Sequence, residues 1–169
     1  LVDILKHTKT HLMNGVSYMI PVVVGGGILM AIAVLLTGEG AAPGWGSGIP
    51  YWLWTIGVDA LGLMCPVFAA YIAFSIADRP GIAVGMAGGF MALNIPTGFA
   101  DGAVTTASAG FIGAAIAGLL GGIIAHYLKK IPLPKSMQSL KSIIIIPVIG
   151  VLAVGIIMFA FGTPIVAFM

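Results

Sequence analysis

The composition of this chain of 169 residues excludes an ordinary water-soluble domain. Charged residues make up 7% of the chain and hydrophobic residues 60%, with a mean hydropathy of +1.16, whereas soluble domains carry about 25% charged residues. So few charges cannot cover a surface that faces water, and most of the chain must therefore face lipid. The net charge of +2 comes from seven basic and five acidic residues, which are too dispersed to form a nucleic-acid-binding face.

Five apolar segments are candidates for membrane-spanning helices, which need about 20 mostly apolar residues. In chain order they are residues 12–36, 51–77, 80–95, 103–128 and 142–162. The only acidic or basic residue within them is Asp59, in the second segment. The sequence therefore predicts an all-α, polytopic transmembrane protein with about five membrane spans.

The third segment is short for a span, because GIAVGMAGGFMALNI covers about 22 Å at 1.5 Å per residue. One alternative is a short or tilted span that ends in a broken helix at Asn94, Ile95 and Pro96. The other is a re-entrant segment, which would move the lysine-rich loop after residue 128 to the outer side. We favour the span because it keeps all basic loops on one side.

The basic residues predict how the chain is oriented in the membrane. If every segment crosses once, all seven lie on one side, and they are Lys6, Lys9, Arg79, Lys129, Lys130, Lys135 and Lys141. The two loops on the other side contain Glu39 and Asp101 but no lysine or arginine. Because lysine and arginine are enriched in cytoplasmic loops, the N-terminus is predicted to be cytoplasmic.

Small residues recur at four-residue spacing in the third and fourth segments, at Gly85 and Gly89 and at several positions within 110–122. Such spacing lets helix backbones approach closely in lipid. It predicts a tight helix contact, either within this chain or between two subunits. In the first segment, residues 25–27 are all glycine and follow Pro21, which favours either a hinge or a kink that permits close packing.

Three polar residues in and after the second segment are candidates for function. A carboxylate within a span should face protein or water, so Asp59 is a candidate for accepting a substrate hydroxyl or carrying a proton. The alternative for Asp59 is an acid at the membrane interface that caps a helix. Asp78 and Arg79 begin the sequence Asp-Arg-Pro-Gly, which is typical of a rigid turn. The functional alternative is a gate or docking point at which the arginine meets a phosphate.

The sequence contains no pattern that predicts covalent chemistry. Cys65 is the single cysteine, and its apolar neighbours favour a small buried residue over a reactive thiol. His7 and His11 share one helix face but lack the further ligands of a metal site. Neither a glycine-rich phosphate loop nor a nucleophile elbow is found. We therefore expect no catalytic residue, metal or cofactor in this chain.

Three long stretches of the sequence resemble consecutive membrane segments of one known family. HLMNGVSYMIPVVVGGGILMAIA is similar to its first segment. CPVFAAYIAFSIADRPGIAVGMAGG resembles its second and third segments, including the turn ADRPG. GFIGAAIAGLLGGIIAHYLKKIPLPKSMQSLKSIIIIPVI resembles its fourth and fifth segments with the basic loop between them. In this order, and over nearly the whole chain, the stretches resemble the fructose-type sugar permease (enzyme IIC) of the bacterial phosphotransferase system.

The resemblance implies a multi-pass protein of the bacterial inner membrane that translocates fructose, or a related sugar, while cytoplasmic IIB phosphorylates it. The implied partners are the sugar, IIB, IIA, the lipid bilayer and a second copy in a homodimer. The phosphocysteine of such systems belongs to IIB, so Cys65 receives no catalytic role. The family's later half carries a Thr-Glu-Gly-Ala-Ile-Pro type motif for sugar binding, which this chain lacks. We therefore expect the N-terminal half of the family domain, mainly its scaffold and dimer interface.

Within this resemblance, Ser17, Asp59 and Asn94 are the candidate residues near the sugar path. Asp78 and Arg79 are the candidate cytoplasmic gate or IIB contact. One rival hypothesis is a channel or ion-coupled transporter in which Asp59 carries the function. Another is a helix-packing protein without transport, based on the glycine-rich fourth segment. The choice between fructose and related sugars is open.

Overall fold

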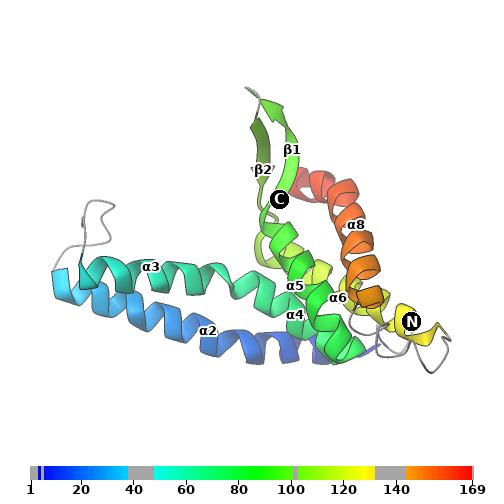
Figure 1. Cartoon of the computed structure of the whole chain (residues 1–169), viewed down its shortest axis with the longest axis horizontal. Helices are drawn as coiled ribbons and strands as arrows, with labels where there is room; N and C mark the ends of the chain where they lie inside the picture. The colour runs from blue at the N-terminus through cyan, green and yellow to red at the C-terminus, as the bar shows by residue number, and fades with distance from the viewer. Residues whose placement is uncertain (1–3, 5, 38–47, 101–102, 132–143, 169) are drawn as a thin grey trace. The chain divides into compact units, whose positions relative to one another are not determined.

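The computed structural model describes residues 4, 6–37, 48–100, 103–131 and 144–168 (Figure 1). The elements in chain order are α2 (Thr8–Thr37), α3 (Ile49–Gly62), α4 (Met64–Ala77), α5 (Arg79–Leu93), β1 (Ile95–Ala100), β2 (Ala103–Ala107), α6 (Gly110–Lys130) and α8 (Ile146–Phe168). Within these described residues, three helical stretches are long and apolar enough to cross a membrane: Thr8–Thr37, Ile49–Ala77 and Gly110–Lys130. The predicted helical, polytopic architecture is confirmed, with one short β-hairpin in addition.

The chain divides into two compact units. Unit 1 contains Leu1–Val16 and Cys65–Met169, and unit 2 contains Ser17–Met64. The first turns of α2 therefore belong to unit 1 and the rest of this helix to unit 2, together with α3. Helices α4, α5, α6 and α8 and the hairpin belong to unit 1.

Unit 2 is a pair of antiparallel helices whose backbones meet at two glycines. A Cβ added to Gly26 would lie 2.9 Å from the carbonyl oxygen of Gly57, and one added to Gly57 would lie 2.8 Å from that of Gly26. Helix α2 continues through Pro21 and the three glycines without a break. Of the two alternatives for the glycines at 25–27, a hinge or close packing, Gly26 therefore serves close packing. Gly25 and Gly27 face open space.

The core of unit 1 is built on small residues of α4, α5 and α6. A Cβ added to Gly85 of α5 would lie 2.5 Å from the carbonyl oxygen of Ala69 in α4, and one added to Gly118 of α6 would lie 2.8 Å from the same oxygen. Gly121 of α6 packs directly against Gly85. Because these positions carry no side chain, the three backbones can approach closely. The predicted tight helix contact is confirmed, and it lies within one chain.

Helix α8 packs against α5 in a parallel orientation. A Cβ added to Gly150 would lie 2.6 Å from the side chain of Val84, and one added to Gly88 would lie 2.8 Å from the side chain of Val154. Since the residue numbers of both helices rise together across these contacts, the first turns of α5 and α8 lie at the same level. Val84 and Val154 are fully buried.

The predicted second segment, residues 51–77, is not one continuous helix. Helix α3 ends at Gly62, Leu63 forms a turn, and α4 begins at Met64. The cause lies in Pro66, which lacks an N–H group and whose ring crowds the carbonyl of the residue four positions earlier, Gly62. The predicted span is therefore present as one apolar stretch, Ile49–Ala77, with an interruption at Leu63.

A two-stranded antiparallel hairpin of β1 and β2 follows α5 and was not anticipated from the sequence. Its register places Ile95 opposite Ala107. Pro96 disfavours a helical backbone at the preceding residue, and β2, with the sequence AVTTA, is rich in β-branched residues that favour strands. The expected helix start at residue 103 is therefore wrong, and the helix begins at Gly110 instead.

Candidate functional site

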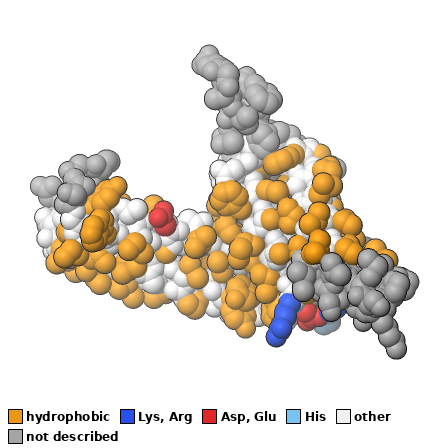
Figure 2. Space-filling model, in the orientation of Figure 1, with side chains coloured by type: hydrophobic (Ala, Val, Ile, Leu, Met, Phe, Trp, Pro, Cys, Tyr) orange, Lys and Arg blue, Asp and Glu red, His pale blue; other side chains and the backbone are white. Residues whose placement is uncertain are grey.

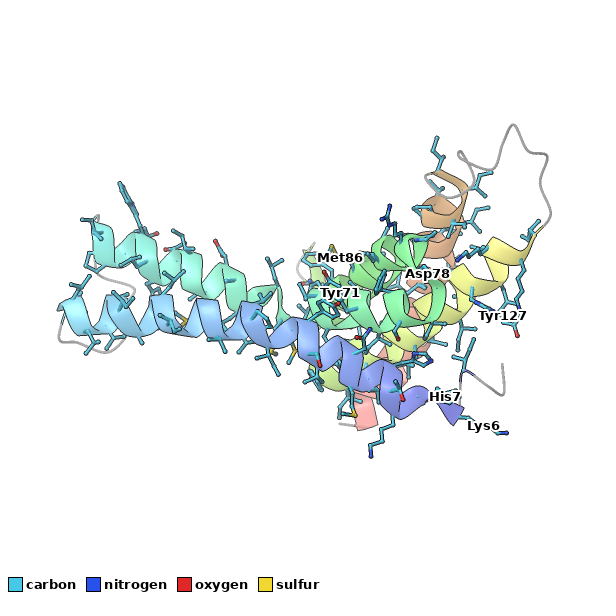
Figure 3. The ribbon with its side chains drawn as sticks, turned by 90° about the horizontal axis from the view of Figure 1, so that it is seen from below. Lys6, His7, Tyr71, Asp78, Met86 and Tyr127 are labelled. Carbon is cyan, nitrogen blue, oxygen red and sulfur yellow. The ribbon has the colours of Figure 1, made fainter. Side chains whose placement is uncertain are left out.

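Polar and charged side chains of unit 1 meet at one end of its helices. His11 Nδ1, near the start of α2, lies 2.5 Å from Ser75 Oγ in the last turn of α4. Lys129 Nζ, in the last turn of α6, lies 2.5 Å from Asp78 Oδ2 in the turn between α4 and α5. The starts of α2 and α5 and the ends of α4 and α6 are thus brought together (Figure 3).

We call this region the charged end, because it gathers the basic residues of the described part of unit 1. They are Lys6, Lys9, Arg79, Lys129 and Lys130. Figure 2 shows that the rest of the visible surface is largely hydrophobic. The predicted gathering of basic residues at one end is confirmed for these five, whereas Lys135 and Lys141 lie outside the described residues. The positive-inside rule assigns such an end to the cytoplasm.

Asp78 connects α4 to α5 through an unusual backbone conformation. Its φ of 60° and ψ of −152° lie in a region that is essentially restricted to glycine. Its N–H donates to the carbonyl of Phe74, and its own carbonyl accepts from the N–H of Gly81. Asp78 is thus the single residue between the end of α4 and the start of α5, and the chain must reverse its direction sharply there. Within the described residues, no other non-glycine residue has a positive φ.

The side chain of Asp78 does not cap α5 but reaches Lys129. Both side chains are exposed, with relative accessibilities of 73% for Asp78 and 47% for Lys129. An ion pair at such exposure contributes about 0.2–1 kcal/mol. The main effect of this ion pair is therefore to link the α4–α5 turn to the last turn of α6. A cation in the last turn of a helix also interacts favourably with the helix dipole.

Arg79 and Lys130 complete the charged end in different ways. The Lys130 ammonium lies 5.9 Å from the centre of the Tyr127 ring, which is within cation–π range. Arg79 is exposed in the first turn of α5. It has no hydrogen-bond or ion-pair partner within the described part of the chain. Its guanidinium is therefore available to an anionic group from outside these residues.

Asn94, a candidate for the sugar path, follows α5 at the end opposite Arg79. Its backbone N–H donates to the carbonyl of Met91, and its side-chain Nδ2 donates to the carbonyl of Phe90 over 3.2 Å. The asparagine thus caps carbonyl groups at the end of α5. The side chain is exposed, and its capping role is a structural reason for its presence.

The other two candidates for the sugar path, Ser17 and Asp59, are exposed residues of unit 2. Asp59 follows Gly57 by two residues, and Gly57 packs against Gly26 of α2. Ser17 precedes Gly26 by nine residues, which is about 13 Å along the helix at 1.5 Å per residue. The two side chains therefore lie at different levels of the helix pair, roughly two turns apart.

Neither the contact of Ser75 nor the pairing of Lys129 was expected from the sequence. Ser75 is a polar residue inside an apolar run, but only the fold shows that His11, 64 residues away, is its partner. Cys65 is buried in α4, as expected for a small apolar residue. Within the described part of the chain, no three His, Cys, Asp or Glu side chains lie close enough together to hold a metal ion.

An apolar groove runs along an exposed side of α8, next to Met91 of α5. It has a volume of about 620 Å³ and is lined by Met91 of α5 and by residues of α8 from Pro147 to Phe159, all of them apolar. No polar side chain lines it, so it cannot bind a sugar through hydrogen bonds. The groove was not expected from the sequence.

Comparisons with known proteins identify the family. The model of the family "Phosphotransferase system, EIIC" matches residues 13–169. The chain is 46% identical over 168 residues to the fructose-like permease IIC component 2 of Escherichia coli (strain K12), covering 98% of this chain and 43% of that protein. No solved structure matches the chain significantly.

Two further relatives carry related descriptions. The chain is 42% identical over 165 residues to the PTS system fructose-specific EIIABC component of Bacillus subtilis (strain 168), covering 94% of this chain and 24% of that protein. It is 37% identical over 171 residues to the PTS system fructose-specific EIIC component of Haloferax volcanii, covering 95% of this chain and 46% of that protein. The chain thus spans less than half the length of each of these relatives. On the family match and these identities, it belongs to the EIIC family of the phosphotransferase system.

Proposed function

We propose that this chain is part of the membrane permease of a phosphoenolpyruvate-dependent phosphotransferase system, which translocates fructose or a related sugar. The proposal rests on the 46% identity to a fructose-like permease IIC component, which extends over 98% of this chain. The descriptions of two other relatives as fructose-specific support the same sugar. The bacterial inner membrane is the proposed location, in keeping with the long apolar helices.

The phosphoryl group would come from a cytoplasmic partner, IIB, which IIA supplies. Relatives described as EIIABC and EIIBC components combine these parts with EIIC in one protein. In this chain, the single cysteine, Cys65, is buried in α4, where a protein phosphoryl donor has no access. The proposed role of the chain is therefore to support binding and passage of the sugar, while the covalent step takes place on the partner.

The charged end is the proposed contact for IIB, with Asp78 and Arg79 as the gate or contact residues. An exposed guanidinium can form paired hydrogen bonds with a phosphate or carboxylate of a partner. Asp78 is tied to Lys129, so a partner that displaces either side chain would act on the α4–α5 turn and on α6 together.

The proposed sugar contacts are Ser17, Asp59 and Asn94. A carboxylate such as that of Asp59 accepts hydrogen bonds from sugar hydroxyls, and exposure of this residue on an apolar helix supports the assignment. Ser17 offers a hydroxyl, also at an exposed position. Asn94 has the weakest support, because its amide already donates to the carbonyl of Phe90.

The chain is also proposed to act mainly as the scaffold and dimer-interface half of the family domain. The small-residue face of α6 is buried within the chain, so a homodimer would need a different surface. Exposed apolar side chains of α8, such as Val148 and Leu152, offer one.

Uptake of labelled fructose by membrane vesicles that carry the complete permease tests this function. With phosphoenolpyruvate and all soluble phosphotransferase proteins present, we expect fructose phosphate to accumulate, and omission of either should prevent it. Uptake of unphosphorylated fructose driven by an ion gradient would contradict the proposal. In that case Asp59→Asn should abolish the uptake, as expected for an ion-coupled transporter whose intramembrane acid carries the function.

A further inference from the structure

The carboxylate of Asp78, which Figure 3 labels in the turn between α4 and α5, is not explained by the stability of that turn. Its φ of 60° and ψ of −152° suit a glycine rather than a residue with a side chain. The side chain makes no capping hydrogen bond to α5, and both members of its ion pair with Lys129 are exposed. Because an exposed ion pair contributes less free energy than such backbone strain costs, the ion pair does not offset the strain.

The ion pair is also not needed to hold α6 against α5. Gly121 of α6 packs directly against Gly85 of α5. The start of α5 is fixed on α4 as well, since a Cβ added to Gly81 would lie 2.5 Å from the carbonyl oxygen of Ala73. These backbone contacts persist whether or not the charged side chains meet. The packed helices therefore hold the turn, and with it the carboxylate of Asp78, beside the cation of α6.

This carboxylate opposes the charge of its surroundings. Asp78 is the only acidic residue among the described residues of unit 1, whereas the charged end contains five lysines and arginines. Such an end attracts anionic groups of a partner, and its field extends over about 8 Å at physiological salt. Asp78 already occupies Lys129, so an approaching anion meets a cation that is partly neutralised. An exposed ion pair is weak enough for another anion to replace one of its members.

We propose that Asp78 is an internal competitor for Lys129, which an anionic group of IIB displaces when IIB docks on the charged end. The inference rests on the proposed IIB contact and refines it, because Asp78 then acts against docking. The displacing group is the phosphoryl group of IIB or one of its surface carboxylates, since an ammonium binds either anion. The exchange moves the carboxylate of Asp78 from Lys129 to water and changes no covalent bond. It makes docking selective, because a protein without a suitably placed anion gains nothing from Lys129.

Binding of soluble IIB to the complete permease in detergent micelles tests the proposal. Isothermal titration calorimetry at low salt gives the dissociation constant for phosphorylated and for unphosphorylated IIB, in the absence of sugar so that no phosphoryl group is transferred. Asp78→Asn removes the negative charge and keeps the size of the side chain. It should tighten binding about two- to fivefold, the factor that an exposed ion pair contributes. At about 1 M salt, where the screening length is about 3 Å, the gain should disappear.

The two forms of IIB identify the displacing group. A gain confined to phosphorylated IIB assigns it to the phosphoryl group, and an equal gain for both forms assigns it to a carboxylate.

Three further variants assign the gain to the ion pair. Lys129→Gln should weaken binding, and Asp78→Asn added to it should bring no gain. Asp78→Gly also removes the carboxylate but relaxes the backbone, and it should give the same gain as Asp78→Asn. Glu39→Gln is the matched control for net charge, because it removes one acid from a loop that the sequence predicts on the other side of the membrane. It should leave binding unchanged.

Several results would overturn the inference. They are the absence of any gain in Asp78→Asn, and a gain that persists in the Lys129→Gln background. Weaker binding by Asp78→Asn would make Asp78 a direct contact for a cation of IIB, and a gain in Asp78→Gly alone would assign the effect to the backbone. In all these cases the unchanged protein still binds IIB, so the proposed contact stands. If the unchanged protein binds neither form of IIB, the proposed contact fails together with this inference, while uptake of fructose tests transport separately.

Discussion

Replacing Asp78 by glycine is expected to leave the protein more stable than replacing it by alanine. The backbone conformation at Asp78, with φ 60° and ψ −152°, is sterically favourable only for glycine. Both substitutions remove the ion pair with Lys129. The alanine variant keeps the backbone strain, whereas the glycine variant relieves it. The comparison of the two variants therefore isolates the backbone term from the side-chain term.

The expected difference follows from two opposing contributions. Backbone strain in this region costs about 1–3 kcal/mol. Glycine also raises the conformational entropy of the unfolded chain, which offsets about 0.4–1 kcal/mol of the gain. The lost ion pair, worth about 0.2–1 kcal/mol, is common to both variants and cancels. The glycine variant should therefore be more stable than the alanine variant by about 1 kcal/mol.

Reversible unfolding in mixed detergent micelles, followed by circular dichroism, measures this difference in the free energy of unfolding. Ala83→Gly provides the control, since Ala83 is exposed on the same helix. There glycine should destabilise the protein by about 1 kcal/mol, the ordinary penalty inside a helix. The reasoning is refuted if Asp78→Gly proves no more stable than Asp78→Ala while the control behaves as expected.

Two further predictions concern helix packing and a side-chain contact between helices. Gly85→Ala should destabilise the protein by about 1–3 kcal/mol through overpacking, because the added Cβ would lie 2.5 Å from the carbonyl oxygen of Ala69. Gly25 faces open space, so Gly25→Ala should instead stabilise the protein by about 0.5–1 kcal/mol. Equal changes in stability for both variants, in the same micelle unfolding assay, would contradict this account. In a double-mutant cycle, His11→Ala and Ser75→Ala should show a coupling of about 0.5–1.5 kcal/mol, the net value of a hydrogen bond, and additive effects would mean that the two side chains do not interact.

The sequence was sufficient to predict the helical membrane class and the gathering of basic residues at one end. Both depend on quantities summed over a local stretch, namely the length of an apolar run and the number of charges beside it. The small-residue spacing around Gly85 and in 110–122 likewise predicted close helix contacts. It could not show whether the partner helix belongs to the same chain, because the spacing describes only one of the two surfaces.

Local backbone preferences were present in the sequence but were hidden by its apolar composition. Pro66 interrupts the helix after Gly62 within one apolar stretch, Ile49–Ala77. The hairpin near Pro96 occupies residues that hydropathy alone assigned partly to a helix. In both cases a steric rule at a proline outweighed the average over the segment.

The sequence by itself determined that the chain forms apolar helices with basic residues at one end. A chain with so few charges must lie in lipid, where no water can bind the backbone, and a helix satisfies the backbone hydrogen bonds within its own segment. Only the tertiary structure decided which polar side chains meet. Asp78 and Lys129 are 51 residues apart, and His11 and Ser75 are 64 residues apart. Such pairs form because several helices, each fixed by its own packing, end at the same level. That geometry belongs to the assembled helices, and no single stretch of sequence contains it.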